Sequence, residues 1–204
     1  MSTVHWIWLQ ETLGAGSNKL QALLSRFDGP KALFEADEAA LRHAGCLRDA
    51  ELQKLLRRDL RPAEEIMEAC RQSGYGILTP DDASYPKRLL RIFNPPLTLY
   101  VCGELPDIDE EVAITIVGPR RATEDGVRAA YRMAGELARA GCLLVSGGAM
   151  GIDGAAHRGA LKAGGKTVAV LGGGLDQIYP KGNAELRKEI AGHGCLLSEY
   201  PPGT

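Results

Sequence analysis

Apolar residues in the first third of the chain recur at helical spacing. Glycine and proline interrupt this pattern at 14–17, 28–30, 45 and 61–62, which are typical breaks between helices. The repeating positions are Leu20, Leu23, Leu24 and Phe27, and then Leu52, Leu55 and Leu56. Residues 1–72 are therefore predicted to form five or six short helices in a small all-helical domain, similar to SAM and helix-hairpin-helix domains. The pattern leaves open whether this domain only packs or also contacts a DNA backbone.

The periodicity changes after residue 110. Short, continuously apolar runs alternate there with helical stretches near 123–140, 153–163 and 182–192. The apolar runs are VAITIVG at 112–118, CLLVSG at 142–147, KTVAVLGGG at 166–174 and CLLSE at 195–199. This alternation predicts an α/β domain over residues 73–204, with a Rossmann-like parallel sheet and helices on both faces. Its first part, 73–110, is a proline-rich bridge in which LTLYVCG predicts a short strand suited to a sheet edge.

Composition limits the classes of function. The 204-residue chain has 24 basic and 26 acidic residues and a formal net charge of −2, so its overall field does not attract nucleic acid. Any anion site must be local, and the part after residue 110 is the more basic one, with 11 basic and 9 acidic residues. The five cysteines lack CxxC spacing, which disfavours a disulfide framework or a zinc cluster. The N-terminus lacks a cationic start followed by a long apolar run, and no later run is long enough to span a membrane, so we expect a soluble cytoplasmic protein. No cofactor is expected.

Each predicted strand of the second domain ends in a distinctive loop. The loops are GPRRATEDG at 118–126, SGGAMGID at 146–153, GGGLDQIYPKGN at 172–183 and SEYPPGT at 198–204. In a parallel α/β sheet all four rise at the carboxyl edge, where ligands bind. Glycine amides and helix N-termini favour phosphate there, and three basic side chains add positive charge. The residues predicted to bind DNA or phosphate are Gly118, Arg120, Arg121, Thr123, Ser146, Gly147, Gly148, Gly151, Asp153, His157, Gly172, Gly174, Tyr179, Lys181 and Asn183.

These loops do not match the common nucleotide-binding motifs. A dinucleotide fingerprint fails because Ala149 and Gln177 stand where its glycines belong. The string ALKAGGKT at 160–167 lacks the first glycine of a P-loop, and its lysine enters a strand rather than a helix. Tyr179 and Tyr200 flank the predicted site, where they either stack on a base or close the edge of the domain.

A catalytic triad is also disfavoured. Ser146 lies in LVSGG rather than in a G-x-S-x-G turn, and Asp153 and His157 are four residues apart on one predicted helix. We expect Asp153 to cap the start of that helix, with His157 as a polar contact one turn later. Asp176 is expected to order its turn through backbone hydrogen bonds.

Four motifs follow one another in a fixed order along the chain. They are GPRRAT at 118–123, SGGAMGIDGAAHRGAL at 146–161, AVLGGGLDQIYPKGN at 169–183 and SEYPPGT at 198–204. Together they resemble the DNA-processing protein A family (DprA, also called Smf), whose pattern is GSR-x-x-T, SG-x-A-x-GID-x-x-AH-x-GAL, AVLG-x-GLD-x-x-YP-x-x-N and SE-x-P-x-G. The upstream segment YPKRLLRIFNPPLTLYVCG is similar to the bridge of that family, so the resemblance covers most of the chain.

The resemblance implies a DNA-binding recombination mediator rather than an enzyme. Members of this family protect single-stranded DNA during natural transformation and load the RecA recombinase onto it, usually as homodimers. The DNA lies in a basic pocket at this sheet edge, where Arg120 matches the arginine of the first motif and Lys181 lies in a bordering turn. Pro119 replaces a usual serine and Met150 a position that is often basic, which predicts a less positive pocket. The chain ends at Thr204, before the downstream F-x-x-RNR-x-I segment and the second half of the family's sheet.

Two further functions stay open at this point. One is a nucleotide-processing enzyme on a similar sheet, such as a nucleoside monophosphate phosphoribohydrolase. The PGG-x-GT-x-x-E motif typical of those enzymes is absent, since PPGT lies at the end of the chain without an acidic partner. The other is a helical interaction module that binds a protein and neither DNA nor nucleotide.

Overall fold

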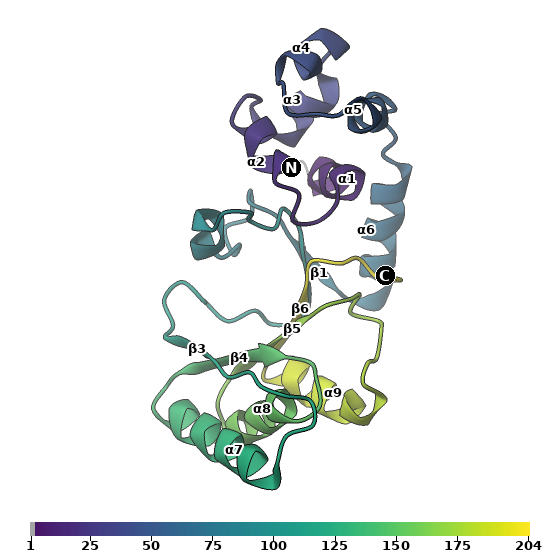
Figure 1. Ribbon diagram of the computed structural model, residues 1–204. Helices are drawn as coiled ribbons and strands as arrows, with labels where there is room; N and C mark the ends of the chain where they lie inside the picture. Colours follow the sequence, from purple (N-terminus) through teal and green to yellow (C-terminus); the bar gives the residue numbers. More distant parts are fainter. Residues whose placement is uncertain (1–2) are drawn as a thin grey trace. The chain divides into compact units, whose positions relative to one another are not determined.

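The computed structural model describes residues 3–204, and the chain divides into two compact units (Figure 1). One unit comprises the chain up to Ser73 together with Ile77–Leu99, and the other comprises Gly74–Gly76 together with Tyr100–Thr204. Most of the proline-rich bridge thus packs with the helical unit, although the sequence pattern assigns it to the second domain.

The first unit is helical, as predicted. The elements that the structure describes in it are α1 (Thr3–Leu13), α2 (Lys19–Leu24), α3 (Gly29–Glu35), α4 (Glu38–His43), α5 (Asp49–Leu56), α6 (Arg61–Ser73) and the 3-10 helix η1 (Lys87–Arg91). Helix α1 is central, because it packs against α2, α3, α5 and α6 and buries five consecutive residues, 6–10. A helix that is apolar on all sides is stable only when neighbours surround it.

The segment 77–99 is joined to this helical core. Leu97 is buried in the same cluster of apolar side chains as α1. The buried amide oxygen of Gln10 accepts hydrogen bonds from the backbone N–H groups of Leu97 and Thr98, at 3.1 and 2.9 Å. Trp6 donates its indole N–H to Asp81 at 2.7 Å. These bonds fix an otherwise irregular segment, because its buried backbone groups need partners.

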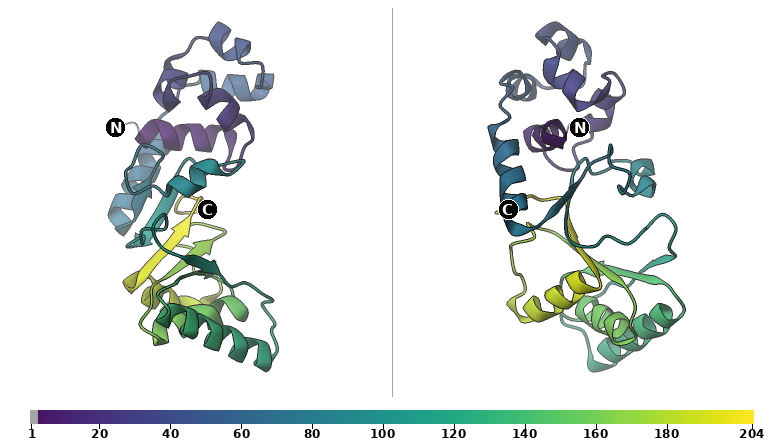
Figure 2. Two further views of the ribbon diagram at one scale, coloured as in Figure 1. Left: turned by 90° about the vertical axis from the view of Figure 1, so that its left-hand side faces the viewer. Right: turned by 180° about the vertical axis from the view of Figure 1, so that it is seen from behind.

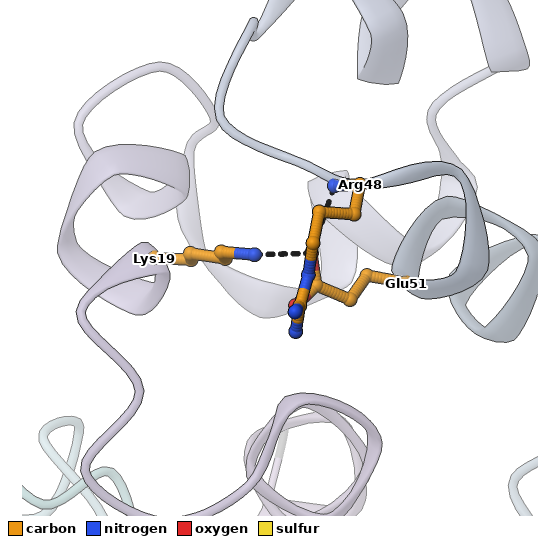
Figure 3. Close-up of polar contacts among 3 residues, drawn as sticks. All are labelled: Lys19, Arg48 and Glu51. Atoms are coloured by element: carbon orange, nitrogen blue, oxygen red, sulfur yellow. Dashed lines mark hydrogen bonds and ion pairs between the residues drawn. The ribbon is translucent and has the colours of Figure 1, made fainter.

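An ionic cluster ties the start of α2 to the start of α5 (Figure 3). The Glu51 carboxylate is paired with the Lys19 ammonium, and it accepts a 2.7 Å bond from the Arg48 guanidinium. It also accepts the backbone N–H of Arg48 at 2.8 Å. One carboxylate therefore satisfies a free amide at the N-terminus of α5 and holds two helices together.

The second unit contains most of a six-stranded sheet. The strands are β1 (Gly76–Leu78), β2 (Leu99–Gly103), β3 (Ala113–Thr115), β4 (Leu143–Gly147), β5 (Thr167–Leu171) and β6 (Gly194–Ser198), in the order β1-β2-β6-β5-β4-β3. Strands β3, β4, β5 and β6 are parallel neighbours, with Ser146 opposite Ala169 and Val170 opposite Leu197. The carboxyl ends of these four strands lie at one edge of the sheet.

The sheet is mixed rather than wholly parallel, because β2 pairs with β6 in the antiparallel sense, with Tyr100 opposite Ser198. Helical crossovers enforce parallel pairing among β3–β6, but β2 comes from the proline-rich bridge and has no such crossover to β6. Strand β2 also lies inside the sheet and not at its edge, since β1 follows it in the order. Pro95 and Pro96 precede β2, so the strand itself contains no proline.

Three helices connect the parallel strands. They are α7 (Glu124–Arg139), α8 (Ile152–Lys162) and α9 (Ala184–Gly192), the last preceded by the 3-10 helix η2 (Lys181–Asn183). Helix α8 lies between α7 and α9 and packs against both (Figure 2). The α7–α8 approach is very close, since a Cβ at Gly159 would lie 2.1 Å from the Tyr131 carbonyl oxygen. The predicted fold class is confirmed: a Rossmann-like α/β sheet with helices, preceded by a helical region.

Two expectations from composition can be compared with the described residues. None of the described helices is long and apolar enough to cross a bilayer. The five cysteines are free thiols, as their spacing predicts.

Candidate functional site

The carboxyl edge of the parallel strands holds a hollow of about 350 Å³. It is formed by the loops that follow β3, β4 and β5, together with the start of α8 and one side chain of α9. The lining residues are Arg120, Gly147, Gly148, Ala149, Asp153, Val170, Leu171, Gly172, Gly173, Gly174, Gln177, Tyr179, Pro180 and Arg187. Three of the four loops that the sequence predicts to converge therefore meet at one place.

The loops after β3 and β4 touch through Gly151. This residue has φ +80° and ψ −126°, a conformation that is open almost only to glycine. A Cβ there would lie 2.4 Å from the Pro119 carbonyl oxygen and 2.7 Å from that of Arg120. A glycine at this position is what lets the loop carrying Arg120 close over the start of α8.

His157 is a buried side chain that contacts the end of β4. Its side chain is only 1% exposed, and its Nε2 and Nδ1 lie 2.9 Å from the Gly147 carbonyl oxygen and 2.8 Å from the Thr167 hydroxyl. Burial lowers the pKa of this imidazole below its ordinary value, because the charged form loses its hydration. The ring is held between the Gly147 carbonyl and the Thr167 hydroxyl, and that hydroxyl donates in turn to the Leu144 carbonyl at 2.9 Å. His157 thus positions the loop and does not reach the hollow.

Asn183 ties the β5 loop to the β4 loop. Its side chain is 2% exposed and donates from Nδ2 to the carbonyl oxygens of Gly148 and Ala149, at 3.2 and 3.0 Å. Its Oδ1 accepts a 3.4 Å bond from Arg158. The side-chain amide of Asn183 therefore links two loops that lie 34 residues apart in the chain. We call this link the Asn183 clamp.

Arg187 of α9 forms part of the wall. It is 5% exposed and donates from Nη1 to the Gln177 carbonyl and from Nη2 to the Leu175 carbonyl, both at 2.7 Å. Burial lowers the pKa of its guanidinium, with partly opposing effects from Tyr75, Cys102 and Asp176. Since arginine still keeps its proton, a buried positive charge borders the hollow.

The hollow has three charged lining residues, namely Arg120, Arg187 and Asp153. Two cations against one anion, beside the backbone of two glycine-rich turns, suit a singly charged anion such as a phosphodiester. Within the described residues, no group of three or more His, Cys, Asp or Glu side chains is arranged to hold a metal ion. The arrangement can bind and orient a phosphate group.

Comparison with known proteins adds to this geometry. The family model of DNA recombination-mediator protein A matches residues 76–204, which is more than half of the chain. The chain belongs to the DNA recombination-mediator protein A (DprA) family. The matched region includes all three loops of the hollow, so the resemblance of the loop motifs to DprA is confirmed.

Curated DprA relatives agree with this assignment. Protein Smf of Synechocystis is 36% identical over 98% of this chain and 51% of its own length. A putative DNA processing protein DprA of Mycobacterium tuberculosis is 42% identical over 72% of this chain and 41% of its own length. The chain thus spans about half the length of the curated relatives it matches.

Two solved DprA structures resemble the fold. The structure of DNA processing protein A from Streptococcus pneumoniae has a TM-score of 0.77 at 27% identity, and the match covers 100% of this chain and 69% of that one. A structure of the Helicobacter pylori protein, which concerns its single-stranded DNA binding mode, has a TM-score of 0.53 at 34% identity. That match covers 63% of this chain and 57% of the other.

The hollow gathers about half of the residues predicted for a DprA-like site. Those that line it are Arg120, Gly147, Gly148, Asp153, Gly172, Gly174 and Tyr179. Gly151, His157 and Asn183 do not line the hollow, but they contact the loops that form it, as described above. Ser146 is also buried, and its hydroxyl donates to the Ile116 carbonyl at 2.6 Å, which links β4 to the end of β3.

The remaining predicted residues lie outside the lining. Thr123 caps α7, since its hydroxyl accepts the Gly126 backbone N–H at 3.2 Å. Gly118 gives room to Ile152, whose Cγ1 would lie 2.5 Å from a Cβ there. Arg121 and Lys181 are exposed, and neither lines the hollow. Lys181 follows directly after the lining residue Pro180 in the chain.

Two expectations about acidic residues have different outcomes. Asp176 orders its turn, as predicted, by accepting the Gly203 backbone N–H at 3.0 and 3.1 Å. Asp153 does not cap α8, since Gly151 occupies the N-cap position and no side chain caps the helix. The close approach of β4 directs the carboxylate elsewhere: a Cβ at Gly147 would lie 2.6 Å from Asp153 Oδ2.

Sequence reasoning missed Arg187. It occurs in AELRKEI, where charged residues are typical of an exposed helix face, and nothing in the local pattern marks it as buried.

Proposed function

We propose that the hollow at the carboxyl edge of the sheet binds single-stranded DNA and that the protein takes part in DNA processing during transformation. The observation that carries this proposal is the convergence of three loops, two guanidinium groups and two glycine-rich turns on one hollow. Membership in the DprA family and the single-stranded DNA binding described for the Helicobacter pylori protein support it.

The physical basis is local rather than global attraction. With a net charge of −2, the protein has no overall positive field for nucleic acid. A strand would instead bind where Arg120 and Arg187 offset its phosphate charge, and the exposed Lys181, next to the lining residue Pro180 in the chain, would add to this attraction. Tyr179 is 71% exposed beside the hollow and provides a face on which a base can stack.

The proposal includes partners and setting. We propose that the protein acts in the cytoplasm, helps to load the RecA recombinase on the bound strand, and does so as a homodimer in a longer polypeptide. Co-sedimentation of RecA with the DNA-bound protein tests the first partner. Sedimentation equilibrium of this chain and of a full-length relative tests the second.

The central experiment is fluorescence anisotropy with a labelled single strand and, separately, its duplex. Arg120→Glu combined with Lys181→Glu is expected to weaken single-strand binding by about tenfold or more, because charge-assisted contacts are lost and replaced by repulsion. Binding by the unmodified chain should fall with salt, with a slope of log K against log salt of about −0.7 per phosphate contact.

A matched control keeps the same change in net charge. Arg132→Glu combined with Lys162→Glu alters two exposed residues of α7 and α8 that do not line the hollow. If both double variants lose equal affinity, binding depends on net charge and the assigned site is wrong. If neither loses affinity, the strand binds elsewhere.

We further propose that the site binds without turnover. The alternative is a phosphoribohydrolase-like enzyme, which would release a free base from nucleoside monophosphates. Incubation with the four nucleoside monophosphates and chromatography for free base distinguishes them. Release of base that is abolished by Asp153→Asn would establish the enzyme instead.

A further inference from the structure

A short loop of the helical unit exposes apolar side chains to water. Leu90, Ile92 and Phe93 are 42%, 47% and 80% exposed, and within the described residues no other large apolar side chain is as exposed as Phe93. The other two phenylalanines of the chain pack against the helical core. Because the backbone from residue 90 to residue 93 spans at most about 11 Å, the three side chains form one patch. A patch of adjacent exposed apolar side chains marks an interaction site.

The loop that carries this patch is fixed to the helical unit. Tyr85 is 2% exposed and donates its hydroxyl to the Pro96 carbonyl, which joins the two ends of the loop. The Gln21 side chain of α2 donates to the Ile92 carbonyl at 3.4 Å. In Figure 1 the loop contains the short blue-green coil below α2. The fold therefore holds the apolar side chains at a defined place on the surface.

Basic residues accompany the patch. Segment 83–103 contains Lys87, Arg88 and Arg91 and no acidic residue, which gives it a formal charge of +3 in a chain whose net charge is −2. All three basic side chains are exposed. In a 3-10 helix, residues three positions apart lie above one another, so Arg88 and Arg91 share one face of η1. A partner that complements this surface carries negative charge.

We propose that residues 87–93 form a docking surface for a protein segment in which acidic side chains accompany apolar ones. Phenylalanine and arginine are both enriched in protein interfaces, where apolar anchors are buried and charges select the partner. Leu90 and Ile92 are aliphatic and do not offer a ring on which a base can stack, which disfavours DNA. Helix η1 has five residues, whereas helices that lie in a membrane interface often have about 20–30, which disfavours lipid.

The docking surface is distinct from the site of the proposed function. None of its residues lines the hollow at the carboxyl edge of the sheet. Loss of single-strand binding at the hollow would therefore leave this inference standing, and failure of this inference would leave the proposed function standing.

The test uses the whole chain and three labelled peptides of equal length. The first alternates glutamate with leucine and phenylalanine, the second has glutamine at every glutamate position, and the third has serine at every apolar position. In fluorescence anisotropy the first peptide is expected to bind about tenfold or more tightly than either of the others, because each of those lacks one of the two kinds of contact. Equal binding of the three peptides, or binding of none, overturns the inference.

Variants of the exposed residues locate the bound peptide. Phe93→Ala and Arg91→Glu should each weaken binding of the first peptide by about fivefold or more, and neither removes a buried side chain. Tyr131→Ala and Arg132→Glu change exposed residues of α7 in the other unit and should leave its affinity unchanged. Losses of equal size in all four variants overturn the inference.

DNA and lipid are tested with the same variant. If Phe93→Ala keeps its affinity for the first peptide but loses affinity for oligothymidylate or for phosphatidylserine vesicles, the surface binds DNA or lipid and the inference is wrong. The comparison of the three peptides on the unmodified chain needs no variant, so it holds even if a substitution impairs folding.

Discussion

Buried polar side chains decide the shape of the site at the scale of single residues. His157, Asn183 and Arg187 all form hydrogen bonds with backbone carbonyls of the loops. The lining of the hollow consists largely of loop backbone, together with the side chains of Arg120 and Asp153. Residues that look like binding groups in the sequence can therefore serve as supports, because a buried carbonyl requires a donor.

The clamp by Asn183 predicts a specific loss. Asn183→Ala leaves the carbonyls of Gly148 and Ala149 without their donor, and we expect the free energy of unfolding to fall by about 2–3 kcal/mol. Urea unfolding measures this change, and single-strand binding should weaken along with it. Asn18→Ala, at an exposed position, serves as control and should change stability little. A fall of equal size in both variants would contradict the clamp.

Glu51 predicts a dependence of stability on pH. Hydrogen bonds from Arg48 and Lys19 lower the pKa of its carboxyl to about 2, well below the ordinary value. Because the folded-state pKa is depressed, the stabilisation is complete above the ordinary pKa near 4.5 and is lost as pH falls toward 2. Glu51→Gln should thus lower the melting temperature at pH 7 and have a shrinking effect between pH 4 and about 2. A difference that is constant with pH would show that the pairs contribute nothing.

The elements themselves are well specified by local pattern. The predicted helices near 123–140 and 153–163 correspond to α7 and α8 within one residue at each end, because Thr123 and Gly151 start them and Gly141 and Gly164 follow them. The position of β2 between β1 and β6 was not predictable in this way, since strand order depends on contacts between distant segments.

The close packing of α7 on α8 makes Gly159 irreplaceable. Gly159→Ala would place a methyl group 2.1 Å from the Tyr131 carbonyl oxygen, and the two helices would have to separate. We expect a loss of more than about 3 kcal/mol in unfolding free energy, at the upper end for overpacking. Gly192→Ala, where a Cβ has open space, is the matched control and should be nearly neutral. Equal stability of the two variants in thermal unfolding would disprove the tight contact.

At the scale of the whole molecule, the division into units gives the bridge a structural role. Leu97 packs with the helical core and Gln10 binds the backbone at residues 97 and 98. The sequence pattern places the domain boundary at residue 72, and that boundary stays a prediction. The contacts of segment 77–99 suggest a direct comparison of fragments.

Fragments 1–73 and 1–99 should differ in stability. The longer fragment restores Leu97 to the core and gives Gln10 its two backbone partners, so we expect it to melt cooperatively at a higher temperature. Circular dichroism during heating measures both. A fragment with Leu97→Ala and residues 1–99 should fall between them. If fragment 1–73 melts as high as fragment 1–99, the bridge adds no stability to the helical unit.

The sequence by itself determined the helical and α/β regions, the loops at the strand ends and the family, because these depend on periodicity, glycine positions and motif order within short segments. It also placed Arg120, the glycine turns and Asp153 at one edge. Only the tertiary structure showed that Arg187 borders the hollow and that His157 and Asn183 support it. Burial and hydrogen-bond partners arise from segments far apart in the chain, and no local pattern records which of them meet.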